Sequence, residues 1–324
     1  MPKNIAAICT CIFLSTFSGI SYSADENPSS DACKSPDPGN LIGRWDITLK
    51  NGEKHLPSWL EVEKSGFKTL VGRYVDTIGS ARPISRISLS HGRFEFSIPP
   101  QWSQGDKDMH LEGAIAGDEI EGIITTSDGK RQTFKGQRAP CLRRTQEPAW
   151  AEPVELFNAK NLAGWKSSLP DNQWKVVNGI LTSDRSGANL ISEQVFGDFK
   201  LHVEFKYPKN GNSGIYLRGR HEVQIADSSR DSEPGSTDFS AIYGFIAPSE
   251  LNTRGADAWQ EFDITLIGRQ VTVIANGKTV ISNQAIPGVT GGALDSHEAE
   301  KGPIYLQGDH TAIAFRKIVI TPAK

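Results

Sequence analysis

Apolar and polar residues alternate along most of this chain in short runs, the pattern of half-buried β-strands. From Phe199 to Tyr207 every second residue is apolar, while His202, Glu204 and Lys206 occupy the positions between. Side chains of a strand point to opposite faces in turn, so one face of this run enters a core. The other face is either solvated or lines a concave cleft. Helical periodicity is nearly absent, and the pattern predicts an all-β protein.

The first half of the chain contains eight such runs at turn-length spacing. Turn signals such as Asn51-Gly52, Ser65-Gly66 and Asp128-Gly129 separate them. Together they predict a small antiparallel barrel or sandwich. The expected strands are Gly43–Leu49, Trp59–Glu63, Val71–Asp76, Ile84–Leu89, Arg93–Ile98, Met109–Ala116, Glu119–Thr125 and Thr133–Arg138.

The second half repeats the pattern on a larger scale, and its Asn276-Gly277 pair is a strong hairpin signal. Many antiparallel strands in one domain predict a two-sheet jelly roll. The expected strands are Trp174–Val177, Ile180–Ser183, Phe199–Tyr207, Ser213–Leu217, His221–Ile225, Gln260–Ile267, Gln270–Ala275, Lys278–Ser282, Ile304–Gln307 and Ala312–Thr321.

The first residues have the layout of a secretory signal peptide. An apolar stretch follows Lys3 and ends in small residues near Ala24, and it is short for a membrane span. We therefore expect a periplasmic or secreted protein with a signal peptide over 1–24. A charged, proline-rich stretch then separates two domains. The predicted limits are a small all-β domain over 25–145, a linker over 146–153 and a jelly roll over 154–324.

Charge and cysteine content narrow the picture further. The net charge of −3 provides no basic surface for nucleic acid and no strong field for membranes. Loss of the signal would remove Cys9 and Cys11 and leave Cys33 and Cys141, which bracket the first domain. In an oxidising compartment a Cys33–Cys141 disulfide is the favoured interpretation, with a metal or catalytic cysteine as the minor alternative.

Several segments of the second domain form a recognisable series: ELFNAKNLAGW, FKLHVEFK, NSGIYLRG, HEVQIAD, AIYGFIAPS, GADAWQEFDITLIGRQVTVIANGK, GPIYLQGDH and FRKI. Through these segments, which cover the whole domain in order, it resembles the 3-keto-disaccharide hydrolase domain family, long known as a domain of unknown function. The resemblance implies a concanavalin-like jelly roll that acts in bacterial carbohydrate breakdown. The runs SWLEV, FEFSIPPQW and GQRAP of the first domain resemble a β module often found beside it.

The resemblance implies an unusual glycoside cleavage. Ordinary glycosidases use two carboxyl groups and an oxocarbenium-like transition state. In a sugar oxidised at C3 the ketone acidifies the C2 hydrogen instead, so a base can form an enolate that expels the aglycone from C1. Addition of water to the enone then gives net hydrolysis. The substrate is a small carbohydrate, and a separate sugar 3-oxidoreductase must make the ketone, because this chain has no nucleotide-binding glycine fingerprint.

The resemblance and the alternation together select the candidate site residues. Arg218, Glu222 and Gln224 are expected on one strand face, with Glu204 on a neighbouring strand. Glu222 or His310 is the candidate base, and Arg218 would stabilise the enolate. A buried polar ladder, a solvated face, a plain turn at His310 or a structural salt bridge at Arg316 are the competing interpretations. The candidate substrate-binding residues are Glu204, Gln224, Tyr243, Gln307, Asp309 and Arg316.

Cofactor use stays open at this point. A divalent ion could bind among Glu222, Gln224, Asp227, Asp309 and His310, although no zinc-type spacing is present. The chain also departs from the common family pattern. It has Gln260 where many relatives have Asn, a GDH run after Gln307, and an extra polar segment over 288–303 that is too long for a hairpin turn. We expect that segment to form a lid or a rim over the site.

A non-catalytic carbohydrate-binding module is the main alternative to an enzyme. Trp165, Trp174 and Trp259 could stack on sugar rings, although strand tryptophans are more often part of a core. A lectin needs no base. Convergence of Glu222, Arg218 and His310 in one pocket with a perturbed pKa would favour the enzyme. A structural surface protein, with the first domain as an interaction face, is a third possibility.

Overall fold

The computed structural model describes residues 39–102, 105–229 and 232–324. The predicted signal peptide and Cys33 lie outside the described residues, so export and the Cys33–Cys141 disulfide stay predictions. Every regular element in the described residues is a β-strand, which confirms the expected fold class. Over the same residues the structure contains no helix long and apolar enough to cross a membrane.

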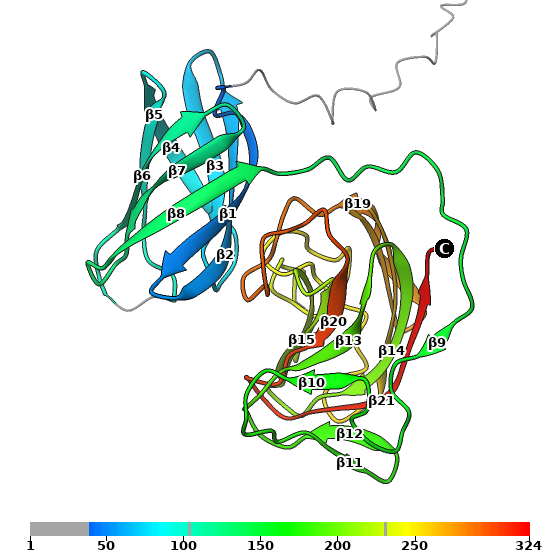
Figure 1. Cartoon of the computed structure of the whole chain (residues 1–324). Helices are drawn as coiled ribbons and strands as arrows, with labels where there is room; N and C mark the ends of the chain where they lie inside the picture. Colours follow the sequence, from blue (N-terminus) through cyan, green and yellow to red (C-terminus); the bar gives the residue numbers. More distant parts are fainter. Residues whose placement is uncertain (1–38, 103–104, 230–231) are drawn as a thin grey trace, which may run out of the picture. The chain divides into compact units, whose positions relative to one another are not determined.

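The first eight strands form a closed antiparallel barrel in which each strand pairs with the next and β1 pairs with β8 (Figure 1). Its core is made of inward-facing side chains such as Trp45, Leu60, Tyr74 and Phe134. The expected strands of this half are all present. Their bounds are β1 Gly43–Asn51, β2 Lys54–Ser65, β3 Thr69–Val75, β4 Arg82–Ser90, β5 Arg93–Ile98, β6 Met109–Ala116, β7 Glu119–Thr125 and β8 Arg131–Arg138.

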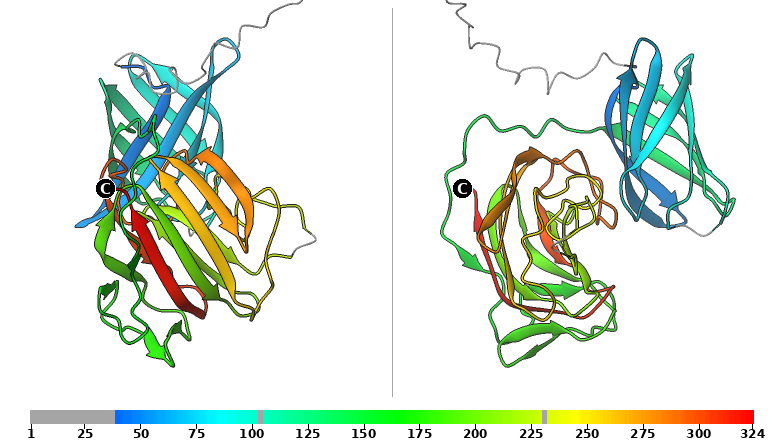
Figure 2. Two further views of the ribbon diagram at one scale, coloured as in Figure 1. Left: turned by 90° about the vertical axis from the view of Figure 1, so that its right-hand side faces the viewer. Right: turned by 180° about the vertical axis from the view of Figure 1, so that it is seen from behind.

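The later strands form two sheets that face one another as a sandwich (Figure 2). The five-stranded sheet has the order β10-β13-β20-β15-β16, with bounds Trp165–Ser167, Leu190–Phe196, Gly302–Leu306, Asn212–Leu217 and His221–Ala226. The eight-stranded sheet has the order β11-β12-β21-β14-β17-β18-β19, with β9 paired to β21. Its bounds are β11 Lys175–Val177, β12 Ile180–Ser183, β21 Ile313–Pro322, β14 Phe199–Lys206, β17 Gln260–Ile267, β18 Gln270–Ala275, β19 Lys278–Ala285 and β9 Val154–Glu155.

The core of the sandwich lies between these sheets, and the alternation in β14 shows how it is built. Leu201, Val203 and Phe205 are buried in the core, whereas His202 and Glu204 lie on the outer face. Phe205 contacts the ring of Phe262 at a centroid distance of 4.7 Å. Burial of side chains of this size stabilises the fold by about 1.5–3 kcal/mol each. The core therefore accounts for the apolar positions of the alternation in this strand.

A tight turn separates β15 from β16, which corrects the expectation that Arg218 shares a strand face with Glu222. Arg218 and Gly219 have φ values of 53° and 69°, in the left-handed region, and Leu217 pairs with His221. The chain reverses between these two positions. The alternation of side chains with period two holds only within one strand. Extending it across the turn from Arg218 to Glu222 therefore assigns Arg218 to the wrong face.

The barrel and the sandwich are in direct contact, and both belong to one compact unit. The Trp59 ring meets the Phe245 ring edge-on at 5.1 Å. The Gly292 amide donates to the Thr77 carbonyl at 2.9 Å. Arg44 donates to the Pro287 carbonyl at 3.2 Å. The predicted domain and linker limits stay predictions, but these contacts show that the barrel rests against the sandwich.

Candidate active site

A cavity of about 430 Å³ lies over the five-stranded sheet, within the size range of small-ligand sites. Strands β15, β16 and β20 supply its floor, and loops from both the sandwich and the barrel supply its walls. The lining residues are Ile78, Gly79, Trp102, Asn212, Tyr216, Glu222, Gln224, Tyr243, Gly291, Gly292, Tyr305, Gln307, Asp309 and His310.

Strand register places the central acid of this site. Glu222 pairs with Tyr216 across β15 and β16, and Gln224 pairs with Gly214, so these positions share one face. A Cβ atom at Gly214 would come within 2.2 Å of Glu222 Oε1. The glycine therefore provides the space in which the carboxyl group of Glu222 lies.

Glu222 has the properties of a carboxyl group kept neutral near pH 7. Its side chain is 3% exposed, and burial raises its pKa to about 8 despite the hydrogen bond with Tyr216. The Tyr216 hydroxyl oxygen lies 2.9 Å from Glu222 Oε2 and 2.9 Å from the Gly291 carbonyl. A hydroxyl has one hydrogen to donate, so a protonated Glu222 that donates to Tyr216 would allow Tyr216 to donate to Gly291.

Asp309 and His310 form an acid–imidazole pair at the rim. His310 Nδ1 lies 2.7 Å from Asp309 Oδ1. The hydrogen bond with Asp309 raises the pKa of His310 above its usual value. Burial acts to raise the pKa of Asp309, but His310 and Asn189 outweigh it and lower that pKa. The carboxylate fixes the orientation of the ring and leaves Nε2 available for proton transfer.

Two amide side chains with an unpaired oxygen line the same cavity. Gln224 and Gln307 both border it, and the Oε1 atom of each is buried and has no hydrogen-bond partner among the described residues. Tyr216 and Tyr305 also line the cavity and stack with ring centroids 4.3 Å apart. Buried polar groups normally have partners, so two such amides beside one cavity indicate a place for polar ligand groups.

Several predicted site residues lie elsewhere. Arg218 is buried at the β15–β16 turn, where its guanidinium donates to the Gly268 carbonyl at 2.7 Å and burial lowers its pKa to about 10. Glu204 is on the eight-stranded sheet, in an ion pair with Arg316. Asp227 accepts from the Asn210 amide at 2.8 Å and caps a loop. None of these four residues lines the cavity.

The tryptophans considered for sugar stacking are also placed away from it. Trp165 and Trp174 are buried in the core of the sandwich, and their indole N–H groups donate to the Leu156 and Ala188 carbonyls. Arg316 lies over the ring of Trp259, 4.5 Å from its centroid. The carbohydrate-stacking role considered for them therefore has no support from their positions.

The residues considered for a divalent ion lie in two places. Glu222, Gln224, Asp309 and His310 line the cavity, whereas Asp227 accepts from the Asn210 amide outside it. The described residues contain no group of three or more His, Cys, Asp or Glu side chains that could hold an ion.

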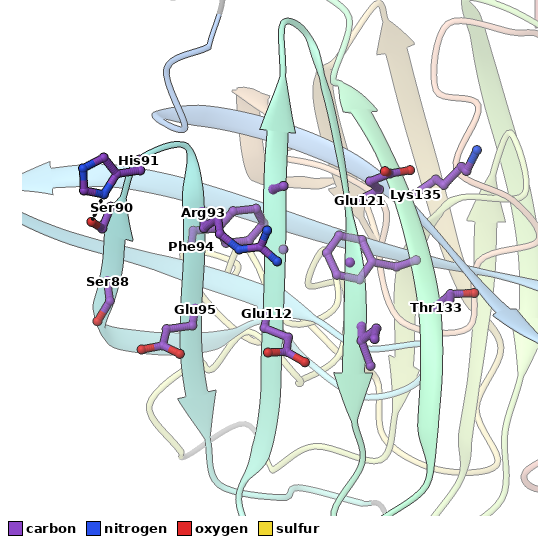
Figure 3. Close-up of a pocket in the computed structure, with 15 residues that line it drawn as sticks. Ser88, Ser90, His91, Arg93, Phe94, Glu95, Glu112, Glu121, Thr133 and Lys135 are labelled. Atoms are coloured by element: carbon purple, nitrogen blue, oxygen red, sulfur yellow. Dashed lines mark hydrogen bonds between the residues drawn. The ribbon is translucent and has the colours of Figure 1, made fainter.

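A second, wider cavity of about 910 Å³ lies on the barrel, along strands β4–β8 (Figure 3). Figure 3 shows Glu95 and Glu112 side by side on neighbouring strands, and these side chains are exposed. Gly113 and Gly122 at its base leave room for the rings of Phe94 and Phe134. The charged groups here are solvated, and no buried unpaired polar atom lines the concavity. The first cavity is therefore the better candidate site.

Comparison with known proteins identifies the family of the part of the chain that holds most of the cavity lining. A family model described as a 3-keto-alpha-glucoside-1,2-lyase-like domain matches residues 152–321, more than half of the chain. The chain belongs to this family. The predicted resemblance is confirmed, and all cavity-lining residues from Asn212 to His310 lie within the matched region.

Individual relatives are more distant. A 3-keto-disaccharide hydrolase from Bacteroides thetaiotaomicron is 28% identical over 95 residues, which cover 25% of this chain and 33% of the relative. The chain thus matches about a third of that relative's length. A solved protein from Parabacteroides distasonis, provisionally named a glycosyl hydrolase, is 30% identical with a TM-score of 0.47, covering 53% of this chain and 84% of its own. Another from that organism is 25% identical with a TM-score of 0.42, covering 52% and 98%.

Membership of the lyase-like family and the name of the curated relative support a glycosyl hydrolase-like enzyme. Five of the predicted site residues line the cavity besides the candidate Glu222: Gln224, Tyr243, Gln307, Asp309 and His310.

Sequence reasoning missed the two stacked tyrosines and the barrel residues of this site. Tyr305 precedes Gln307 by two positions and shares its face, so the same alternation could have identified it. Tyr216 would have followed from the hairpin register once the Arg218 turn was recognised. The contribution of Trp102 leaves no signal in the sequence, because it depends on how the barrel meets the sandwich.

Proposed function

We propose that this chain cleaves 3-keto-glycosides by removing the C2 proton and eliminating the aglycone from C1, with net hydrolysis after water adds. The observation that carries the proposal is the coexistence, around one cavity, of an Asp309–His310 pair and a buried Glu222 whose pKa is about 8. The reaction needs an unprotonated base and a protonated acid at the same pH.

In the first step neutral His310 takes the C2 proton on Nε2. The electrons of the C–H bond form the C2=C3 double bond, and the C3 carbonyl becomes an enolate oxygen. Asp309 holds the ring and stabilises the imidazolium that results. The sequence allowed either His310 or Glu222 as the base, and the burial that keeps Glu222 protonated leaves His310 as the candidate base.

Protonated Glu222 supplies the donor for the enolate oxygen when its O–H turns from the Tyr216 hydroxyl to the substrate. A carboxyl group that is protonated near pH 7 can donate a hydrogen bond or its proton to developing negative charge. Burial also raises the pKa of Tyr216, so its hydroxyl keeps its proton and its bond to the Gly291 carbonyl. Glu222 takes the role considered for Arg218, which lies outside the cavity.

In the second step the enolate reforms the ketone and expels the aglycone. The C1–O bond breaks, a C1=C2 double bond forms, and the imidazolium of His310 returns a proton to the leaving oxygen. Water then adds at C1 and C2 regains a proton, which gives the free 3-keto sugar. The amide side chains of Gln224 and Gln307, which line the cavity, bind the sugar hydroxyls.

A carbohydrate-binding module remains the alternative function. It would use the same amide acceptors but would need neither the Asp309–His310 pair nor a buried neutral carboxyl group. Both features have a role in the elimination, and this favours the enzyme.

The proposed substrate also implies a partner enzyme, and the predicted signal peptide implies a cellular location. A separate sugar 3-oxidoreductase must generate the ketone, and the predicted signal peptide places the reaction in the periplasm or outside the cell. Fractionation of cells that express the full chain would test the location, and retention in the cytoplasm would contradict it.

Incubation of the purified protein with a 3-keto-glucoside and with its parent glucoside tests the reaction. We expect release of the aglycone from the oxidised substrate alone, and slower release when deuterium replaces hydrogen at C2. Equal cleavage of the parent, or no cleavage of either compound, would overturn the proposal.

A further inference from the structure

The barrel supplies part of the cavity wall through Ile78, Gly79 and Trp102, which take no part in the proposed chemical steps. Trp102 follows β5, and its side chain is 68% exposed although it borders the cavity. A large exposed indole beside a polar site offers an apolar face on which a ring of a ligand can pack.

Backbone contacts fix the barrel loop against the sandwich at this wall. A Cβ atom at Gly291 would lie 2.2 Å from the Gly79 carbonyl oxygen, and one at Gly244 would lie 2.7 Å from Ser80 Cα. The Gly292 amide also donates to Thr77 at 2.9 Å. These glycines let two backbones touch, so the wall has little freedom to move.

Trp102 is held to that same loop. Gln101 Oε1 accepts from the Ser80 amide at 3.2 Å, and Gln101 Nε2 donates to the Ser80 hydroxyl at 2.7 Å. A Cβ atom at Gly79 would come within 2.8 Å of Trp102 Cδ1. On the sandwich side, burial raises the pKa of Tyr243, and a side-chain hydrogen bond with Trp102 acts in the opposite direction. The indole is therefore held in place while much of its surface stays open.

Burial varies from one end of the cavity to the other. Tyr216, Glu222, Gln224 and Gln307 at the floor are buried, whereas Trp102 is exposed. The ring that carries C2 and C3 must reach the floor, because Glu222 and Tyr216 lie there. Its C1 substituent then extends toward the open end at Trp102, through which a released aglycone can leave.

We propose that Trp102 is the platform of a subsite for the aglycone, and that the aglycone is a second ring, a sugar or an aromatic group, that stacks on the indole. This inference rests on the proposed function for the direction of the substrate. Sugars present apolar C–H faces that pack on aromatic rings, and Trp offers the largest such surface. The barrel is then a part of the site and determines which glycosides are cleaved.

Two oxidised substrates test the platform, one with a hexose as aglycone and one with a methyl group. We expect Trp102→Ala to lower kcat/KM about 3–10-fold for the hexose substrate, as loss of a stacking contact predicts. The methyl substrate should change less than about twofold, because it has no ring to stack. Trp102→Phe should recover part of the lost rate. Phe67→Ala is the matched control, since Phe67 is an exposed barrel aromatic that does not line the cavity.

Equal losses for both substrates would show that Trp102 only supports the loop and would overturn the inference. Calorimetric titration with an unoxidised disaccharide and its monosaccharide tests the subsite without catalysis. Wild-type protein should bind the disaccharide more tightly, and Trp102→Ala should remove the difference. If no glycoside is cleaved but this preference holds, the proposed reaction fails and the subsite stands. If Trp102→Ala binds both sugars as wild type does, the subsite fails.

Discussion

Glu222 in the cavity and Asp46 on strand β1 of the barrel are both buried carboxyl groups with raised pKa values, yet they differ in what surrounds them. Burial raises the pKa of Asp46 to about 10 and that of Glu222 to about 8. Asp46 shares a hydrogen bond with Glu298, which forms an ion pair with Arg269. Glu222 instead borders a cavity with unpaired amide oxygens.

The difference teaches that a perturbed pKa alone does not identify a catalytic group. Asp46 has its proton fixed between two carboxyl groups and does not line the candidate cavity. Burial acts to raise the pKa of Glu298, but Arg269 and His221 outweigh it and lower that pKa. The cluster at Asp46 therefore joins the barrel to the sandwich, whereas Glu222 has a cavity in which to act.

The largest expected effect is on catalysis at the cavity. His310→Ala should lower kcat about 10²–10⁴-fold, because it removes the proposed base. The fold should be retained, since His310 is half-exposed at a rim. The matched control is His297→Ala, which removes an exposed histidine that lies near Asp295 and has no part in the proposed mechanism. Steady-state rates with a 3-keto-glucoside measure both, and equal rates for His310→Ala and wild type would refute the assignment of the base.

A comparable effect on stability is expected at the barrel–sandwich cluster. Glu298→Ala leaves Arg269 buried without its carboxylate and should lower the free energy of unfolding by about 3–5 kcal/mol. Glu250→Ala breaks an exposed pair with Lys278 and should cost less than about 1 kcal/mol. Chemical denaturation measures the two. Similar values for both variants would show that the cluster does not hold the domains together.

A smaller and more diagnostic effect is expected for Glu222→Gln. The amide still donates a hydrogen bond, so kcat should fall less than about 10²-fold. Wild-type activity should decline above about pH 8, where Glu222 loses its proton, and the variant should lack this decline. At low pH both should lose activity as His310 becomes protonated, at a pKa above its usual value. Complete inactivity of Glu222→Gln would instead identify Glu222 as the base.

The smallest effect is expected for Asp46→Asn at acidic pH, where the wild-type carboxyl group is protonated in both the folded and the unfolded chain. A carboxyl group whose pKa is higher in the folded chain takes up a proton on folding. The carboxyl group of Asp46 contributes its full stability below the pKa that it has in the unfolded chain. This contribution is lost as the pH rises from that value to the folded pKa of about 10. The amide mimics the protonated acid and does not titrate. Denaturation between pH 6 and 10 should show wild type losing stability relative to the variant. A loss as large as that of Glu298→Ala would contradict this.

Much of the site could be predicted from local patterns. The strands of the barrel follow from alternation and turn residues, and Glu222 and Gln224 share a face because they are two positions apart on one strand. Gln307, Asp309 and His310 followed from their place at the end of a strand in a family-like segment. All five line the cavity.

Local patterns were sufficient to predict the strands, the faces within each strand and the family, because a period of two is a property of the local backbone. The position of Glu204 on the other sheet, the turn at Arg218 and the place of Trp102 beside the cavity could be found only in the folded chain. Sheet membership and domain contacts depend on pairings between residues far apart in the chain. Such pairings are selected by the packing of the whole core, which no local pattern encodes.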